Sequence, residues 1–137
     1  MAFLLDTNVV SELRKATPHP NVAAWHSRSR SAASYISALV VGEIRSGIER
    51  MRPRDPRQAE NLERWLTRMV TSYQDRILAV SLDVAQEWGR LNAADPIPVV
   101  DGLMAATALV HRLTLVTRNV NDVGRTGVVV VNPFDME

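Results

Sequence analysis

The chain alternates short, continuously apolar runs with longer stretches in which apolar residues recur every three or four positions. The short runs predict strands, because the strands of a parallel sheet that is covered on both faces are apolar on both sides. These runs occupy residues 3–5, 35–37, 77–80 and 114–117, and four valines follow at 128–131. The chain therefore carries the strands of a small, buried sheet.

The longer stretches predict helices, because a spacing of three and four places apolar side chains on one helical face. A break rich in proline and arginine at residues 52–56 separates two of them, and Pro96 and Pro98 follow another. The last predicted helix is apolar nearly all round, which is typical of a helix that is buried between other elements. The predicted helices cover residues 9–14, 21–28, 39–51, 62–73, 100–113 and a stretch from Ser81 or Asp83 to Leu91.

Strands that alternate with helices predict an α/β fold, in which a short, mainly parallel central sheet is flanked by helices. We find no linker, internal repeat or low-complexity segment in the sequence. We therefore expect residues 1–137 to form one domain, which is a common size for a domain with its own core.

Composition excludes several classes of protein. With 46% hydrophobic and 23% charged residues, and no apolar run near the roughly 20 residues that span a bilayer, we expect a soluble protein. The first residues, MAFLLDTN, do not read as a secretory signal, and a cytoplasmic location is expected. The absence of cysteine excludes disulfides and thiolate metal sites. A net charge of +1 excludes a bulk polycation of the kind that coats DNA, although only Lys15 among the 16 basic residues is not arginine.

Three acids stand where the predicted strands give way to helices. Asp6 directly follows the first strand, and its alternative role is the N-cap of the next helix. Glu43 lies in the first turns of the predicted helix 39–51, after the second strand, and is expected to be half-buried; alternatively it pairs with an arginine such as Arg50. Asp101 begins the apolar helix, where it too could be a cap.

Ligands of open α/β sheets bind beyond the carboxyl ends of the strands, so these three acids are expected to line one binding site. Their mutual repulsion would raise their pKa values unless a cation neutralises them. Oxygen ligands without histidine or cysteine select Mg²⁺, or Mn²⁺ as a substitute, over zinc. Such an ion polarises a phosphoryl group and lowers the pKa of a bound water, and the expected chemistry is phosphodiester hydrolysis.

A fourth contribution could come from residues 117–122, at the end of the fourth predicted strand. Asn119 could orient water or phosphate, and Asp122 could ligate a second ion. The alternative is a plain turn of asparagine and aspartate ahead of Gly124.

Four motifs in this order resemble the PIN domain, and in particular the VapC or FitB-like toxins of bacterial toxin–antitoxin pairs. They run LLDTNVVSEL, ISALVVGEIRSGI, VVDGLMAATALVHRLTLVTRN and VNPF, and together they extend nearly from end to end. The resemblance implies a PIN-like three-layer α/β/α fold and a Mg²⁺-dependent ribonuclease that cuts RNA. It implies catalytic and metal-binding roles for Asp6, Glu43 and Asp101, and a site lined by Thr7, Asn8, Thr117 and Asn119.

The same resemblance implies partners. Such toxins are usually homodimers held inactive by a small antitoxin, in a heterotetramer or larger assembly, with the antitoxin tail across the active-site groove. The docking face here would be the helices around Gly47 and Trp65. The chain departs from the family's pattern at Asn119, where some FitB-like members have an acid, and at Asp122-Val123, where many VapC toxins have Asp-Phe. The fourth catalytic acid, Asp122, and a second metal ion therefore stay open.

Other readings compete with a nuclease. A haloacid-dehalogenase-like phosphotransferase needs a second aspartate two residues after the first, where this chain has Asn8, and a later lysine that it lacks; a receiver domain lacks the same lysine. The stronger alternative is a non-catalytic, nucleic-acid-binding or partner-binding PIN-like subunit with a lapsed metal site. Metal binding distinguishes this alternative from the enzyme.

Overall fold

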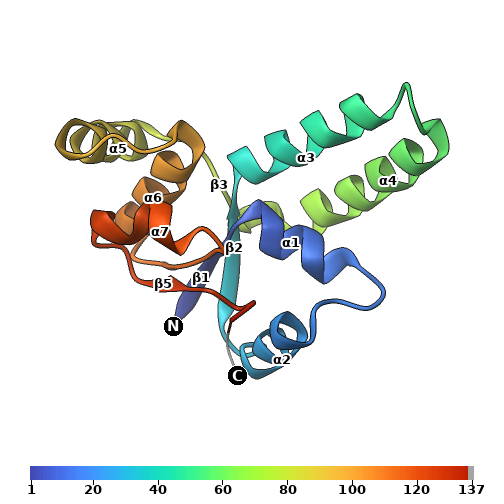
Figure 1. Ribbon diagram of the computed structural model, residues 1–137, viewed down its shortest axis with the longest axis horizontal. Helices are drawn as coiled ribbons and strands as arrows, with labels where there is room; N and C mark the ends of the chain where they lie inside the picture. The colour runs from blue at the N-terminus through green and yellow to red at the C-terminus, as the bar shows by residue number, and fades with distance from the viewer. Residues whose placement is uncertain (136–137) are drawn as a thin grey trace.

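The computed structural model describes residues 1–135 and contains five strands and seven α-helices (Figure 1). The strands are β1 (Ala2–Leu5), β2 (Ala33–Ser37), β3 (Ile77–Leu78), β4 (Thr114–Val116) and β5 (Val130–Val131). The helices are α1 (Thr7–Arg14), α2 (Pro20–Arg28), α3 (Ala38–Met51), α4 (Pro56–Tyr73), α5 (Leu82–Ala94), α6 (Val99–His111) and α7 (Val120–Val123). Two short 3-10 turns, Gln74–Arg76 and Gly124–Thr126, follow α4 and α7.

The five strands form one parallel sheet in the order β3-β2-β1-β4-β5. Figure 1 shows α5, α6 and α7 on one side of this sheet and α1 to α4 on the other. The predicted three-layer α/β/α class is therefore confirmed. Because all strands run the same way, the loops that follow β1, β2 and β4 meet at one edge of the sheet, and this edge receives the predicted acids.

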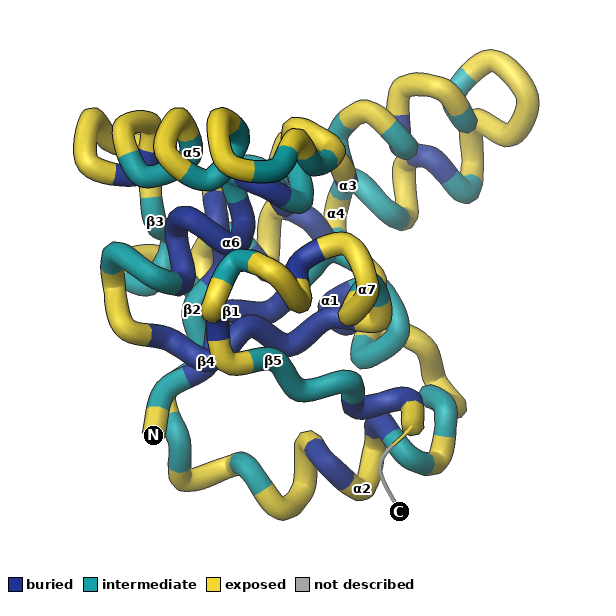
Figure 2. Tube along the Cα trace, turned by 60° about the vertical axis from the view of Figure 1, so that its left-hand side comes forward, coloured by how far each residue is buried: buried dark blue, intermediate teal, exposed yellow. Residues whose placement is uncertain are grey.

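The core is made by the central strand and by the apolar helix α6. Leu4 and Leu5 of β1 and Ala105 and Ala108 of α6 are 0 or 1% exposed, and Figure 2 shows this buried centre in dark blue. The small side chains of Ala105 and Ala108 allow α6 to approach its neighbours closely, and the helix is buried, as its apolar sequence predicted. No helix among residues 1–135 has the length and apolar character that crossing a membrane requires.

Several predicted element ends are wrong by one to six residues, the most at α4, which begins at Pro56 rather than Leu62 because Asp55 caps it. The first helix begins at Thr7 rather than Val9, because Asp6 already caps it. The apolar helix ends at His111 rather than Leu113, since Arg112 takes a left-handed conformation that stops it. The edge strands β3 and β5 have two residues each, shorter than the predicted runs 77–80 and 128–131, because an edge strand pairs on one side only.

Helices α3 and α4 form a hairpin that extends away from the sheet (Figure 1). Ile44 and Ile48 of α3 are buried, as the helical spacing predicted. On its surface, two arginines and two glutamates form a network: Arg45 contacts Glu49 at 2.9 Å and Glu63 at 3.0 Å, and Arg52 contacts the same two carboxylates. These ion pairs join α3 to α4 in the part of the hairpin that extends away from the sheet.

Candidate functional site

Asp6 occupies the corner between β1 and α1, and both of its carboxylate oxygens accept hydrogen bonds. The backbone N–H of Thr7 donates to Oδ1 at 2.6 Å, and the hydroxyl of Thr117 donates to Oδ2 at 2.6 Å. Asp6 is therefore the N-cap of α1, which was the alternative, and it is also fixed from the end of the neighbouring strand β4. Two donors of this kind hold the carboxylate in one orientation.

Glu43 reaches the same corner from α3. The hydroxyl of Thr7 donates to Glu43 Oε1 at 2.5 Å, so that Thr7 contacts both acids. The expectation that Glu43 is half-buried is wrong, because its side chain extends from the first turns of α3 into open space and is exposed. It does not pair with Arg50, which donates to Ser46 instead.

Asp101 is the third residue of α6 and does not cap this helix. Pro98 occupies the N-cap position, and no side chain caps the helix there. Burial, followed by the charges of Asp122 and Asp6, raises the pKa of the Asp101 carboxyl, while a hydrogen bond from Asn119 lowers it in part. The nearby carboxyl group of Asp122 also favours the protonated form of Asp101.

A hollow of about 390 Å³ joins these side chains at the carboxyl edge of the sheet. Six predicted site residues line it: Asp6, Thr7, Asn8, Glu43, Asp101 and Asn119. Thr117 is buried behind it, and its hydroxyl accepts from the backbone N–H of Asn119 at 3.0 Å. Asp122 is placed next to Asp101 but does not line the hollow. A larger hollow of about 440 Å³, beside Trp25 and Arg76, is lined by no carboxylate.

Three lining residues were not predicted: Pro98, Val99 and Val100. The sequence around them was interpreted only as the end of one helix and the start of another. Val99 is 58% exposed, which is unusual for a residue at the start of an otherwise buried helix. Its position on the rim of the hollow becomes evident only once the fold brings α6 beside β1.

The donor set of the hollow suits a hard divalent cation. Carboxylate and amide oxygens surround it, and a carboxyl whose pKa is raised by two other carboxylates is a place where a cation would relieve repulsion. Among residues 1–135, no three acidic or histidine side chains lie close enough together to enclose an ion directly. An ion that binds through one or two carboxylates and several waters, as Mg²⁺ commonly does, fits this open arrangement.

Comparison with known proteins places the chain in a family. Residues 3–125 match the PIN domain. The chain is 32% identical to VapC ribonuclease Y4jK of Sinorhizobium fredii and 31% identical to toxin FitB of Neisseria gonorrhoeae, over 97% and 96% of its length and 98% of theirs. The crystal structure of FitAcB from Neisseria gonorrhoeae superposes with a TM-score of 0.86 at 30% identity, over 98% of this chain and 99% of that chain. The chain therefore belongs to the PIN domain family, and within it resembles the VapC and FitB toxins along its whole described fold.

Proposed function

We propose that this protein is a Mg²⁺-dependent endoribonuclease and the toxin of a toxin–antitoxin pair, with its 137 residues in one domain. The observation that carries the proposal is the meeting of Asp6, Glu43 and Asp101 at one hollow, from three separate elements. The relatives support it, since one is named a ribonuclease and another a toxin.

In this proposal, each acid keeps its orientation through neighbouring donors. Thr117 and the backbone of Thr7 orient Asp6, while the hydroxyl of Thr7 orients Glu43. The pKa of Asp101 is raised by burial and by the charges of Asp122 and Asp6. The site therefore consists of two acids held by fixed hydrogen bonds and a third whose charge is disfavoured by burial and by neighbouring carboxylates, which a bound cation would offset.

One or two of the acids Asp6, Glu43 and Asp101 would bind the ion directly and the rest through water molecules, and Asn119 or Asp122 would complete its surroundings. A bound Mg²⁺ supplies charge that polarises the phosphodiester and lowers the pKa of a water. The chain's own residues restrict the position of the phosphate: Asn8 and Asn119 offer amide groups to it, and Pro98 and Val99 form an apolar wall. Hydrolysis by water leaves a 5′-phosphate and a 3′-hydroxyl, whereas attack by the 2′-hydroxyl would leave a cyclic phosphate.

The direct test measures cleavage of single-stranded RNA with Mg²⁺, with Mn²⁺ and with a chelator, for the parent and for Asp6→Asn and Asp101→Asn. We expect cleavage by the parent with either metal and a loss of at least a hundredfold in both variants. Asp75→Asn, which changes an exposed aspartate of the turn after α4, is the matched control and should cut like the parent.

Two results would contradict the enzyme. Equal cleavage by Asp101→Asn and the parent would show that the site is elsewhere. RNA binding without metal binding and without cleavage would instead support the alternative, a non-catalytic PIN-like subunit with a lapsed metal site. Analysis of the product ends separates hydrolysis by water from attack by the 2′-hydroxyl.

A groove between α1, α3 and α4 supports the proposed docking of an antitoxin. Gly47, Trp65 and Met51 line it, and it shares Thr7 and Glu43 with the acidic hollow. An antitoxin segment that lies in this apolar groove would therefore reach the carboxylates, where a basic side chain would be attracted.

We propose that the toxin works in the cytoplasm as a homodimer, and as a heterotetramer or larger assembly with its antitoxin. Co-expression with the neighbouring reading frame, followed by mass measurement of the complex, tests this.

A further inference from the structure

Arg118 directly follows Thr117 of the acidic site but forms no ion pair with a carboxylate of residues 1–135. It stands between Thr117, which binds Asp6, and Asn119, which lines the hollow. Its guanidinium carbon is 3.8 Å from the centre of the Phe134 ring, and the side chain is exposed. No carboxylate of residues 1–135 lies within ion-pair distance of it. A guanidinium stacked in this way keeps its N–H donors available at its edge.

The ring beneath Arg118 is fixed from several sides. The backbone N–H of Phe134 donates to the side chain of Asn132 at 3.0 Å, and its carbonyl accepts from Asn21 of α2 at 2.7 Å. The rings of His19 and Phe134 form a T-shaped contact with their centres 5.6 Å apart, and Phe134 is 6% exposed. The guanidinium of Arg118 therefore rests on a rigid support, so that little side-chain freedom is lost when it binds a ligand.

Arg14 repeats this arrangement on the other side of the site. It ends α1, is exposed, and lies over the ring of Trp65 at 5.7 Å from its centre. It lines the groove that shares Thr7 and Glu43 with the acidic hollow. In the sheet order, Arg118 follows β4 on one side of β1, whereas the groove of Arg14 opens toward α3, which follows β2 on the other side. The two cations therefore flank the corner that holds Asp6.

Several other arginines are already engaged by the protein itself. Arg45 and Arg52 contact Glu49 and Glu63, and Arg125 contacts Asp95 at 2.7 Å. Arg76 donates to two backbone carbonyls at the opposite end of the sheet. Arg14 lines the groove, and Arg118 directly precedes Asn119, which lines the hollow. The two arginines share two properties: a ring supports each, and no carboxylate of residues 1–135 lies within ion-pair distance of either.

We propose that Arg118 and Arg14 bind backbone phosphates of a single-stranded polynucleotide on the two sides of the acidic hollow. The inference rests on the proposed function. A hollow of carboxylates repels a polyanion, so that most of the affinity for RNA must come from cations that border it. Arginine presents paired donors that match a phosphate, and a contact of this kind holds the strand without reading its bases.

The proposal is tested by RNA binding in an Asp101→Asn background, where cleavage does not interfere. Arg118→Met and Arg14→Met keep a long unbranched side chain over each ring and remove only the charged guanidinium group. We expect each to weaken binding of a fluorescein-labelled single-stranded RNA roughly tenfold, as for one lost charged hydrogen bond, and to reduce the slope of log affinity against log salt by about one. The loss should be similar for RNAs of different sequence.

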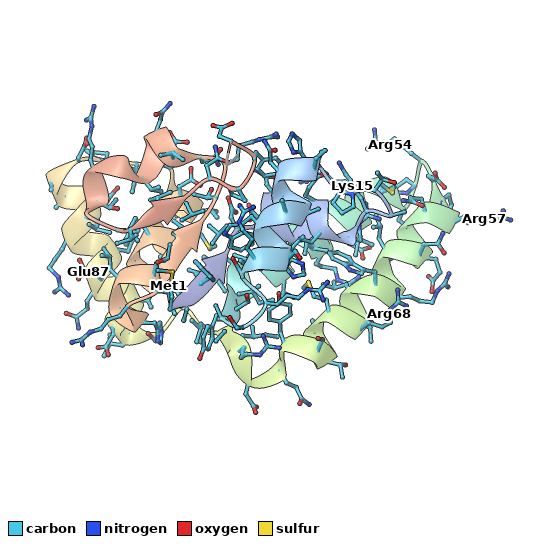
Figure 3. The ribbon with its side chains drawn as sticks, turned by 90° about the horizontal axis from the view of Figure 1, so that it is seen from below. Met1, Lys15, Arg54, Arg57, Arg68 and Glu87 are labelled. Carbon is cyan, nitrogen blue, oxygen red and sulfur yellow. The ribbon has the colours of Figure 1, made fainter. Side chains whose placement is uncertain are left out.

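Arg57→Met is the matched control. It removes the same charge from the first turn of α4, where Figure 3 shows the side chain pointing away from the body of the protein. It should leave RNA affinity and the salt slope near those of the parent. In the active protein, the Arg118 and Arg14 variants should raise KM with a small change in kcat, because the lost contact binds substrate and transition state alike.

The possible failures are distinguishable. RNA affinity equal to that of Arg57→Met in both variants would overturn this inference and leave the proposed function intact. If the parent neither binds nor cuts RNA, the proposed function fails and the inference fails with it. If Arg118→Met does not fold, Arg118→Lys decides: it keeps the charge but loses the planar fork, and we expect weaker binding than for Arg57→Lys, with equal binding overturning the proposal.

Discussion

Thr117 shows how a single hydroxyl can organise the site. It is 3% exposed, donates to Asp6 and accepts from the backbone of Asn119, so that it connects the ends of β1 and β4. Residues behind a metal ligand commonly alter metal affinity by 10- to 100-fold, because they set the ligand's orientation.

Replacing Thr117 by valine should therefore weaken Mn²⁺ binding by roughly tenfold or more, with a loss of stability of about 1 kcal/mol for each of the two broken hydrogen bonds. Titration calorimetry measures the first and thermal unfolding the second. Thr107→Val is the control, since Thr107 is fully buried in α6 and its hydroxyl binds only Leu103 of the same helix. Equal Mn²⁺ affinity in the two variants would contradict a positioning role for Thr117.

The raised pKa of Asp101 has a consequence for stability. A carboxyl whose pKa is higher in the folded state favours folding while it is protonated, and its charge opposes folding as the pH rises above that pKa. In the absence of metal, Asp101→Asn should therefore have a higher melting temperature than the parent at pH 7. The difference should shrink as the pH falls toward the ordinary value of 3.8.

Thermal unfolding in a chelator across this pH range tests the sign of the effect. The same substitution at Asp75, an exposed residue, should not raise the melting temperature at pH 7. A lower melting temperature for Asp101→Asn than for the parent at pH 7 would mean that the charged form of Asp101 stabilises the metal-free fold.

At the scale of elements, the α3–α4 hairpin depends on ion pairs that acid should weaken. The guanidinium of Arg52 first, and then that of Arg45, lowers the pKa of Glu49 to about 2, and the same arginines lower the pKa of Glu63. A lowered carboxyl pKa contributes stability that is present above the ordinary value of 4.5 and is lost as the pH falls toward about 2. These groups lie at the surface, where salt screens them.

We expect the protection of α4 amides from hydrogen exchange to fall, relative to that of α6, between pH 4.5 and pH 2.5. In Arg52→Gln, the α4 amides should be less protected already at neutral pH. The comparison uses Arg57→Gln, which changes an arginine of α4 itself without removing one of these ion pairs. Similar α4 protection in Arg52→Gln and Arg57→Gln would show that packing alone holds the hairpin.

Apart from the short helix α7, where a turn was the alternative prediction, the order of strands and helices could be predicted from the sequence, because each short apolar run and each spacing of three and four is a local signal. The convergence of Asp6 and Glu43 followed, since parallel strands end at one edge. Asp101 lies in the first turn of α6, which follows α5 rather than a strand, so its place at this edge comes from the packing of α6 and not from a strand end. The exposure of Glu43 could not be predicted, because it depends on the open space beside Asp6 and on the hydroxyl of Thr7. The bond between Thr117 and Asp6 joins residues 111 positions apart, which no local pattern reports.

At the scale of the whole molecule, a bound divalent ion should stabilise the fold. Binding to the folded state alone adds about 2.7 kcal/mol when the ion is present at roughly 100 times its Kd, which corresponds to a rise in melting temperature of roughly 10 °C. We expect this rise with Mn²⁺ at pH 7, and its disappearance near pH 4 as the carboxylates protonate. Asp6→Asn should abolish it, while Asp75→Asn should keep it.

The order of the sheet also has a consequence for biosynthesis. Asp6 is synthesised before residue 117, yet its strand β1 lies between β2 and β4, and the hydroxyl that orients Asp6 belongs to residue 117. A polypeptide still attached to the ribosome cannot assemble this corner until β4 has left the exit tunnel. A chain that stalls before residue 114 lacks the hydroxyl that orients Asp6, and we expect it to lack the complete acidic site.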